Sequence, residues 1–178
     1  NVTEYTYDYE LDPVLDPRYG EKGNLVTITY PTVNAGTPEV NFTYNEHGQV
    51  IKVEDPNGNI TEYEYFADTG YLQRIIQDRS GLNAVTEFAY DNYGNLDWVK
   101  DANGHTTDFQ FDGMTWLNQI TNPLTYVTKY SQDANGNVTK IERQMDENAT
   151  QWQETVFTYT NLNHLETTVL VDLTMRRK

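Results

Sequence analysis

The stretch TEYEY, residues 61–65, decides the fold of this chain. Its threonine and tyrosine side chains alternate with two carboxylates, and an alternation of period two sends the rings to one face of a β-strand and the charges to the other. The same alternation returns in TEFAY, residues 86–90, and in TDFQF, residues 107–111. Further copies of this stretch at a fixed spacing would decide the architecture, since a period of about 20 to 50 residues indicates a repeat fold.

Seven copies of a two-strand unit are visible. The first halves are residues 3–7, 40–44, 61–65, 86–90, 107–111, 126–130 (YVTKY, a degenerate sixth copy) and 155–159. The second halves are residues 24–28, 49–53, 71–75, 95–99, 116–120, 137–141 and 164–168. Seven alternating runs at matched phase predict strands throughout, and we expect almost no helix.

The spacing of the units predicts how the strands pair. Successive closing aromatics are 37, 21, 25, 21, 19 and 29 residues apart, so about 20 residues form the basic unit and the excess is insertion. Twenty residues hold two strands and two turns without a helical crossover, which predicts antiparallel neighbours in a meander. We expect one array over residues 1–178, with insertions at 8–23 and 142–154 and a disordered tail at 173–178.

Two details of the unit concern its second strand and its turns. The apolar residues of the second strand lie three apart, as at Leu96 and Val99, which indicates a bulge or a leucine that belongs to the turn. One turn family follows the aromatic, at residues 45–48 and 91–94, with a longer form at 132–136 in the sixth copy. The other, at residues 55–59 and 101–105, contains Asn-Gly, which supplies the positive φ of tight hairpins.

Composition excludes several functions. The chain has no cysteine, so no disulfide, thiolate metal site or cysteine nucleophile is available. A formal charge of −15 disfavours nucleic acid and anionic lipid as partners. No apolar run approaches the roughly 20 residues that cross a bilayer, so we expect no membrane insertion. Asn1 opens within a repeat, so we expect a segment of a longer chain.

The repeat resembles a known family. The pattern Y-D-x-x-G-N-L at Tyr90, Asp91, Gly94, Asn95 and Leu96, followed by D-x-N-G-x-x-T from residue 101, resembles the YD repeat of Rhs and teneurin proteins. The YD dipeptide itself is kept only at Asp8 and Asp91. The other residues of the signature are Tyr44, Gly48, Tyr65, Gly70, Asp101, Gly104, Phe111, Tyr130, Gly136 and Tyr159.

The resemblance implies an all-β fold in which an open, curved sheet of hairpins spirals as a segment of a hollow shell. Such proteins are secreted or lie at the cell surface, where the shell encloses a variable C-terminal toxin domain or, in teneurins, forms part of an adhesion ectodomain. The implied partners are neighbouring repeats and an enclosed toxin domain, and neither role needs catalysis or a cofactor. The self-cleavage motif of the toxins contains Asp-Pro, but we interpret Asp12-Pro13 and Asp16-Pro17 as turn formers in an insertion.

Several candidate sites have a simpler structural explanation. The loops at Asp55, Asp101 and Asp133 resemble part of a calcium loop without its third acidic ligand or its closing glutamate, which favours ordinary turns. The histidines have no second histidine at ligand spacing, so we assign no metal site; they are His47, His105 and His164. Glu62 and Glu64 could form an acid/base pair, but carboxylates on an outer strand face are usually solvated, and we assign no catalytic residue.

Two further groups of residues leave binding open as the alternative function. Aromatic side chains such as Trp98, Trp116 and Trp152 could bind carbohydrate or protein on an adhesion surface, although sheet packing explains their spacing first. Unpaired edges at both ends could also join copies of the chain edge to edge. Five N-x-T sequons would carry glycans only in a eukaryotic secretory route; they begin at Asn1, Asn41, Asn59, Asn137 and Asn148.

Overall fold

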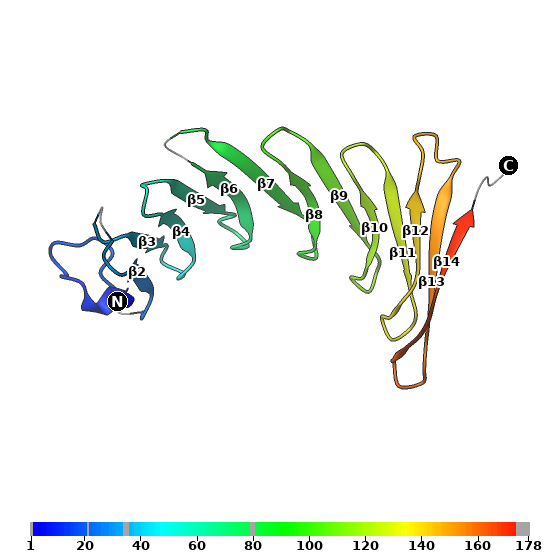
Figure 1. The fold of residues 1–178 in the computed structure, drawn as a ribbon, viewed down its shortest axis with the longest axis horizontal. Coiled ribbons are helices and arrows are strands. Elements are labelled where there is room, and N and C mark those ends of the chain that lie inside the picture. Colours follow the sequence, from blue (N-terminus) through cyan, green and yellow to red (C-terminus); the bar gives the residue numbers. More distant parts are fainter. Residues whose placement is uncertain (1, 21, 34–35, 79–80, 174–178) are drawn as a thin grey trace. The chain divides into compact units, whose positions relative to one another are not determined.

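The computed structural model describes residues 2–20, 22–33, 36–78 and 81–173. Most of the tail expected at 173–178 therefore lies outside the described residues. Contacts between Cα atoms group the chain into two compact units, Asn1–Glu87 and Phe88–Lys178. Each unit is a meander of antiparallel strands in a single layer (Figure 1).

The first unit holds a short 3-10 helix, η1 (Asp8–Glu10), and seven strands, the last of which crosses the boundary of the unit. The strands are β1 (Glu4–Tyr7), β2 (Leu25–Thr29), β3 (Glu39–Tyr44), β4 (Val50–Glu54), β5 (Ile60–Tyr65), β6 (Leu72–Gln77) and β7 (Ala84–Tyr90). The strands of the second unit are β8 (Leu96–Lys100), β9 (Thr106–Phe111), β10 (Leu117–Thr121), β11 (Val127–Gln132), β12 (Val138–Gln144), β13 (Trp152–Tyr159) and β14 (Leu165–Leu173).

The strand order in the sheet follows the sequence from β1 to β14, which confirms the predicted all-β antiparallel meander. Residues 142–144 and 152–154 of the expected second insertion are strand residues, so only residues 145–151 connect β12 to β13. No helix in the described part of the chain is long and apolar enough to cross a membrane.

A β-bulge in six hairpins explains the irregular spacing of the second strand. Tyr44 pairs with Val50, but the next pair is Thr43 with Lys52, so one extra residue of β4 lies between them. Ladders of five other hairpins contain the same shift next to the closing residue: β1 with β2, β5 with β6, β9 with β10, β11 with β12, and β13 with β14. The predicted bulge is thereby confirmed, and it restores the alternation in the rest of the strand.

One side of the sheet, which we call the aromatic face, carries the repeated rings. In five hairpins an aromatic residue of the first strand lies opposite an aliphatic residue of the second strand, as Tyr63 lies opposite Ile75. At several junctions that aliphatic residue lies opposite a threonine of the next repeat, as Ile75 lies opposite Thr86. The aromatic–aliphatic pairs are Tyr5 with Ile28, Phe42 with Val53, Tyr63 with Ile75, Phe109 with Ile120 and Tyr130 with Ile141. Such cross-strand pairs are the main stabilising unit of a sheet.

The opposite side, which we call the charged face, carries ion pairs between strands. Arg74 of β6 lies opposite both Glu64 and Glu87 and makes ion pairs with them at 3.4 and 3.0 Å. Lys140 of β12 lies 3.1 Å from Glu142 and 3.9 Å from Glu154. The carboxylates of these two clusters are therefore paired with a cation, within or across strands.

Burial is shallow because each unit is one layer thick. Among the described residues only two apolar side chains are buried, Val26 and Ile76, at 1% and 3% exposed. Most strand residues are half-buried. Their burial comes from neighbouring strands of the same sheet, so the array is stabilised from repeat to repeat, as in other solenoid-like proteins.

Candidate functional site

The turns of the array share one hydrogen-bonding pattern. In the turn after β7, one carboxylate oxygen of Asp91 accepts the backbone N–H groups of Tyr93 and Asn95, at 2.8 and 2.9 Å. Its second oxygen accepts the side-chain amide of Asn95 at 2.9 Å. Asp91 is the first residue of its turn, and the first residue of other turns accepts a backbone N–H group in the same way. These residues are Asn45, Asp55, Asp101, Asp112, Asn122, Asp133 and Thr160.

This pattern accounts for the calcium-like loops. The oxygens of Asp55 and Asp133 accept hydrogen bonds within their own turns, including those of Asn59 and Asn137. These hydrogen bonds lower the pKa of both carboxyl groups; the side-chain amide has the largest effect in each turn. The described residues contain no cluster of three metal-ligating side chains. The chemistry of these loops is therefore that of an Asx turn.

The fourth residue of each turn has a left-handed backbone, which explains the repeated glycine. Gly48 and Gly136 have φ of 79° and 84°, where a side chain would add strain. Three turns place another residue at this position: Thr115, Thr125 and Asn163, with φ of 62°, 67° and 60°. Signature glycines Gly70, Gly94 and Gly104 also have positive φ, at 71°, 86° and 85°.

Three closing tyrosines connect their two-strand unit to the one before it. The hydroxyl group of Tyr44 donates to the backbone carbonyl of Leu25, at 2.7 Å, and that of Tyr65 donates to Val50, at 2.8 Å. Tyr159 makes the same bond to Val138 at 2.9 Å. Burial raises the pKa of Tyr44 and Tyr65, so both hydroxyl groups keep their protons for donation at neutral pH. We call this contact the inter-repeat latch.

The structure corrects the assignment of the sixth copy. Tyr130 is not its closing residue, because it lies opposite Ile141 in the row of aromatic–aliphatic pairs. Gln132 takes the closing position opposite Val138, and its side-chain amide donates to the carbonyl of Leu117 at 2.6 Å. The turn therefore begins at Asp133 and has the ordinary length, not the longer form expected for residues 132–136.

A second row of contacts joins the turns along one edge. The amide of Gln49 donates to the carbonyl of Gly70 at 2.8 Å. In the second compact unit of the chain, the side chain of Asn163 accepts hydrogen bonds from the side chains of Asn135 and Asn137, at 3.1 and 3.0 Å. A Cβ atom at Gly136 would lie 3.3 Å from the indole ring of Trp116, so the side chain before β10, like that before β4, packs against the next turn.

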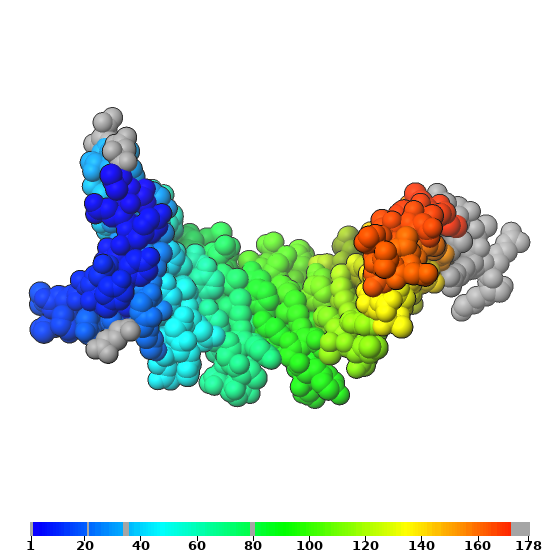
Figure 2. Space-filling model, turned by 90° about the horizontal axis from the view of Figure 1, so that it is seen from below, coloured from blue at the N-terminus to red at the C-terminus, as the bar shows by residue number. Residues whose placement is uncertain are grey.

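The N-terminal insertion interrupts an ordinary turn. Asp8 occupies the first position, Gly23 the left-handed position, and the N–H group of Gly23 donates to the Asp8 carboxylate at 3.0 Å. Asp8 is only 2% exposed and packs so closely against Gly20 that an added Cβ atom would lie 2.8 Å from its oxygen. The intervening residues project beyond the strands of the first unit, at the dark blue end of the space-filling view (Figure 2).

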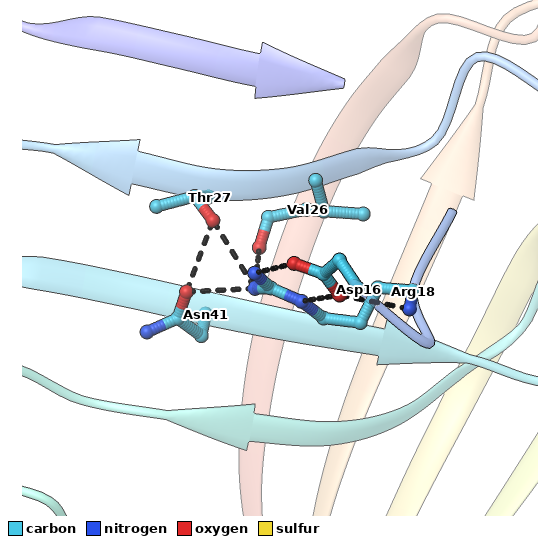
Figure 3. A network of polar contacts seen from close by, with 5 residues as sticks. All are labelled: Asp16, Arg18, Val26, Thr27 and Asn41. Carbon is cyan, nitrogen blue, oxygen red and sulfur yellow. Dashed lines mark hydrogen bonds and ion pairs between the residues drawn. The ribbon is translucent and has the colours of Figure 1, made fainter. Parts of the chain in front are cut away.

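Arg18 anchors this insertion to the charged face. Its guanidinium group donates to the carbonyl of Val26 at 3.3 Å, to Thr27 at 3.2 Å and to Asn41 at 2.9 Å (Figure 3). It also forms an ion pair with Asp16 at 2.8 Å, and this contact lowers the pKa of Asp16. Lys22 donates to the carbonyl of Glu46 in the next turn. Sequence reasoning missed Arg18, because the insertion follows no repeat.

The remaining candidates do not come together. His47, His105 and His164 lie in three separate turns, and the ring of His105 lies 3.3 Å from the carboxylate of Asp101 in its own turn. Trp98 and Trp152 lie opposite Asp108 and Gln144, which places them on the charged face and away from the repeated rings. Lys129 lies 5.4 Å from the ring of Trp152, as a cation–π pair.

Three of the sequon asparagines use their side chains within the fold. Asn41 accepts from Arg18, Asn59 donates to Asp55, and Asn137 donates to Asp133. Asn1 lies outside the described residues, and Asn148 lies in the loop between β12 and β13.

Comparison with known proteins gives one consistent result. No family model and no curated protein sequence matches the chain. Solved structures do match the chain. The structure of TcdB2-TccC3-Cdc42 matches it with a TM-score of 0.71 and a sequence identity of 20%, and the match covers 94% of this chain and 9% of that one. TcdB2-TccC3 gives a TM-score of 0.69 and 21% identity, over 94% and 9%.

A third match is a Tc holotoxin pore of Photorhabdus luminescens, with a TM-score of 0.62 and 20% identity over 85% of this chain and 10% of that one. The chain thus spans about a tenth of the structures that it resembles. The fold implied by the YD-repeat resemblance is therefore confirmed: the chain has the fold of a segment of TcdB2-TccC3, a long antiparallel sheet of repeated hairpins.

Proposed function

We propose that the chain is a non-catalytic structural segment of a larger secreted or surface protein of the YD-repeat type. Its repeats form part of a curved β-sheet wall that encloses or presents a toxin-like domain of the same protein. The inter-repeat latch is the observation that carries this proposal. The side chains that close the first strand, such as those of Tyr44 and Gln132, donate to the backbone of the preceding repeat and so join the repeats to one another.

Two other observations support an architectural role. The turn carboxylates, such as that of Asp91, are occupied by their own turns. The matching structures include a Tc holotoxin pore, and the match covers most of the length of this chain. A wall needs regular units that support one another, and the hydrogen bonds within the turns and between the repeats provide that support.

Protection of an enclosed domain tests the proposal. In the full-length parent protein, we expect the domain outside the repeats to resist protease, and a variant with Tyr44→Phe, Tyr65→Phe and Gln132→Ala to lose this protection in part. Tyr63→Phe is the matched control, because Tyr63 shares β5 with Tyr65 but lies in the row of aromatic–aliphatic pairs, opposite Ile75. Digestion of that domain in the intact protein at the same rate as in the same domain alone would contradict a wall.

The alternative function is adhesion through carbohydrate or protein on the aromatic face. A second experiment tests this alternative. The isolated chain is applied to a glycan array. Saturable binding that is lost on replacing Phe42 and Tyr63 with leucine, together with an unprotected domain in the parent, would replace the wall by an adhesion module.

A further inference from the structure

A pocket lies between the N-terminal insertion and the sheet of the first unit. The insertion contributes Asp8, Tyr19, Gly20 and Lys22 to its lining, and the sheet contributes Val26 and Tyr44. The bonds from Arg18 to β2 and β3 hold the insertion in place over this part of the sheet (Figure 3). The pocket is therefore preformed, and it is no part of the repeat, since the insertion follows none.

One wall of the pocket is a buried carboxylate with an unused acceptor. Asp8 is 2% exposed, and one of its oxygens accepts the N–H group of Gly23 at 3.0 Å. In the regular turn after β7, the second oxygen of Asp91 accepts the side-chain amide of Asn95. Asn24 is the counterpart of Asn95, because its carbonyl accepts the N–H group of Asp8 in the same way. Among the described residues, neither Asn24 nor any other residue donates to Oδ2 of Asp8, which leaves a buried acceptor open to a ligand.

Gly20 keeps this oxygen within reach of a ligand. An added Cβ atom at Gly20 would lie 2.8 Å from Oδ2 of Asp8, so a larger side chain would cover the oxygen. Gly20 is not one of the glycines with positive φ, so the backbone does not require glycine here. The absence of a side chain at Gly20 is therefore explained by the space that it leaves beside the carboxylate.

The other groups of the pocket favour an uncharged ligand with hydroxyl groups. The ammonium group of Lys22 donates to the carbonyl of Glu46 in the turn opposite, and keeps hydrogens for another acceptor. A cation in the pocket would meet Lys22, whereas an anion would meet Asp8 in a chain of formal charge −15. A hydroxyl group both donates and accepts, so a pair of hydroxyl groups satisfies the carboxylate and the ammonium group together. Tyr19, which is 38% exposed, adds an aromatic ring against which the C–H groups of a sugar can pack.

We propose that this pocket, which we call the insertion pocket, binds a neutral sugar residue. One hydroxyl group of the sugar donates to Oδ2 of Asp8, an adjacent hydroxyl group accepts from Lys22, and the sugar ring packs against Tyr19. The site uses none of the aromatic–aliphatic pairs of the aromatic face. It also does not depend on what the repeats enclose.

Titration of the chain with single sugars tests the proposal. Glucose, galactose, mannose and N-acetylglucosamine are added to the isotope-labelled chain, and the amide signals of Gly20 and Gly23 are followed by NMR. We expect at least one of these sugars to shift both signals, with a dissociation constant on the order of 1 mM for a ligand of this size. Glucuronate and glucosamine carry a charge and should bind more weakly. A panel in which no sugar shifts these signals, or in which a charged sugar binds best, would overturn the proposal.

Asp8→Asn tests the carboxylate. The substitution keeps an oxygen for the N–H group of Gly23 and replaces the open acceptor by a donor, and Asn45 shows that asparagine can hold the first position of a turn. We expect binding to weaken by roughly tenfold or more. Asp91→Asn is the matched control: it removes the same charge from a turn without an insertion, and it should bind the sugar as the parent does. Equal affinities of Asp8→Asn and the parent would rule out the contact with Asp8.

Two further variants test the other walls of the insertion pocket. Lys22 is exposed, so Lys22→Met removes a donor while the strands stay folded, and we expect weaker binding. Gly20→Ala fills the space beside Asp8 and is expected to abolish binding, with circular dichroism as the check on the strands. Replacing Phe42 and Tyr63 with leucine should leave the affinity unchanged, which separates this site from adhesion through the aromatic face. Full binding by Lys22→Met and Gly20→Ala, or its loss in the variant of the aromatic face, would place the sugar elsewhere and overturn the proposal.

Discussion

The side-chain amide of Gln132 donates a hydrogen bond of 2.6 Å to the backbone carbonyl of Leu117. This is the position at which Tyr44, Tyr65 and Tyr159 donate with their hydroxyl groups in other units. What the array requires at this point is therefore a donor that reaches the preceding repeat, and a ring is one way to supply it.

The first prediction concerns this donor. Gln132→Ala leaves the carbonyl of Leu117 without its partner and is expected to lower the free energy of unfolding by about 1 kcal/mol. Gln132→Tyr keeps a donor of the type found in the other units and is expected to retain the stability of the parent. Urea unfolding followed by circular dichroism measures both, and Gln110→Ala, at an exposed position of β9, is the control. Equal losses in Gln132→Ala and Gln110→Ala would show that the latch does not stabilise the array.

The second prediction adds a latch where the chain has none. Phe111 closes β9 opposite Leu117 but has no hydroxyl group with which to donate. Phe111→Tyr supplies that group to the carbonyl of Leu96, the counterpart of Leu25 and Val50, and is expected to stabilise the chain by about 1 kcal/mol. The same substitution at Phe157, which lies opposite Thr168 in the other row, should change little. An unfolding midpoint that does not rise for Phe111→Tyr would limit the latch to its native positions.

The sequence predicts the repeat well because its evidence is periodic. Alternation in residues 61–65 and the turn glycines such as Gly48 predict the strands and the meander, whereas the spacing of the second strand left a bulge and a leucine of the turn as alternatives, of which the structure shows the bulge. The error at Tyr130 arose from following ring type instead of spacing: Gln132 stands six residues before Val138, as Tyr44 stands six before Val50.

The sequence does not predict the contacts of the N-terminal insertion, and the reason is a different one. Arg18 meets Asn41 across 23 residues, and nothing periodic relates the two. The placement of Trp98 on the charged face was also not apparent, because the alternation of the first strand does not set the face of a residue in the second strand.

The third prediction concerns backbone strain in two turns. Thr115 and Thr125 have φ of 62° and 67°, a left-handed conformation that is costly for a β-branched residue. Thr115→Gly and Thr125→Gly are each expected to stabilise the chain by about 1 kcal/mol. Glycine relieves the backbone strain of the folded state, and this gain exceeds the larger conformational entropy that glycine gives to the unfolded chain. Gly104→Thr, at φ of 85°, is the reverse substitution and should destabilise it. Calorimetric midpoints that shift the same way in all three variants would contradict this account.

The fourth prediction concerns the stability of the chain at acidic pH. The backbone N–H group of His105, and then that of Asn103, lower the pKa of Asp101 below its usual value. Because the folded pKa lies below the unfolded value of about 3.9, this stability is present above that pH and is lost as the pH falls through the folded pKa. In Asp101→Asn, the amide oxygen can accept the same N–H groups, as Asn45 does, without titrating. We expect urea midpoints between about pH 5 and pH 3 to fall less steeply for this variant, and an unchanged slope would contradict the shift.

The fifth prediction concerns the anchor of the insertion. Without the guanidinium group of Arg18, Asp16 loses its ion pair and the insertion loses its bonds to Val26, Thr27 and Asn41. We expect Arg18→Ala to accelerate chymotrypsin cleavage at Leu15 and Tyr19 by roughly tenfold or more while the strands stay folded. Arg18→Lys keeps the charge but cannot reach several acceptors at once, so its cleavage rate should fall between those of the parent and Arg18→Ala.

The same digestion contains its own reference. Leu82, in the turn between β6 and β7, is 82% exposed and has no part in the anchor, so its cleavage rate should not change. Faster cleavage at both places would mean that Arg18 stabilises the whole first unit, and unchanged cleavage at both would mean that the remaining bonds of Asp8 and Lys22 hold the insertion. Only a selective increase at Leu15 and Tyr19 fits an anchor that holds one segment on an array stable without it.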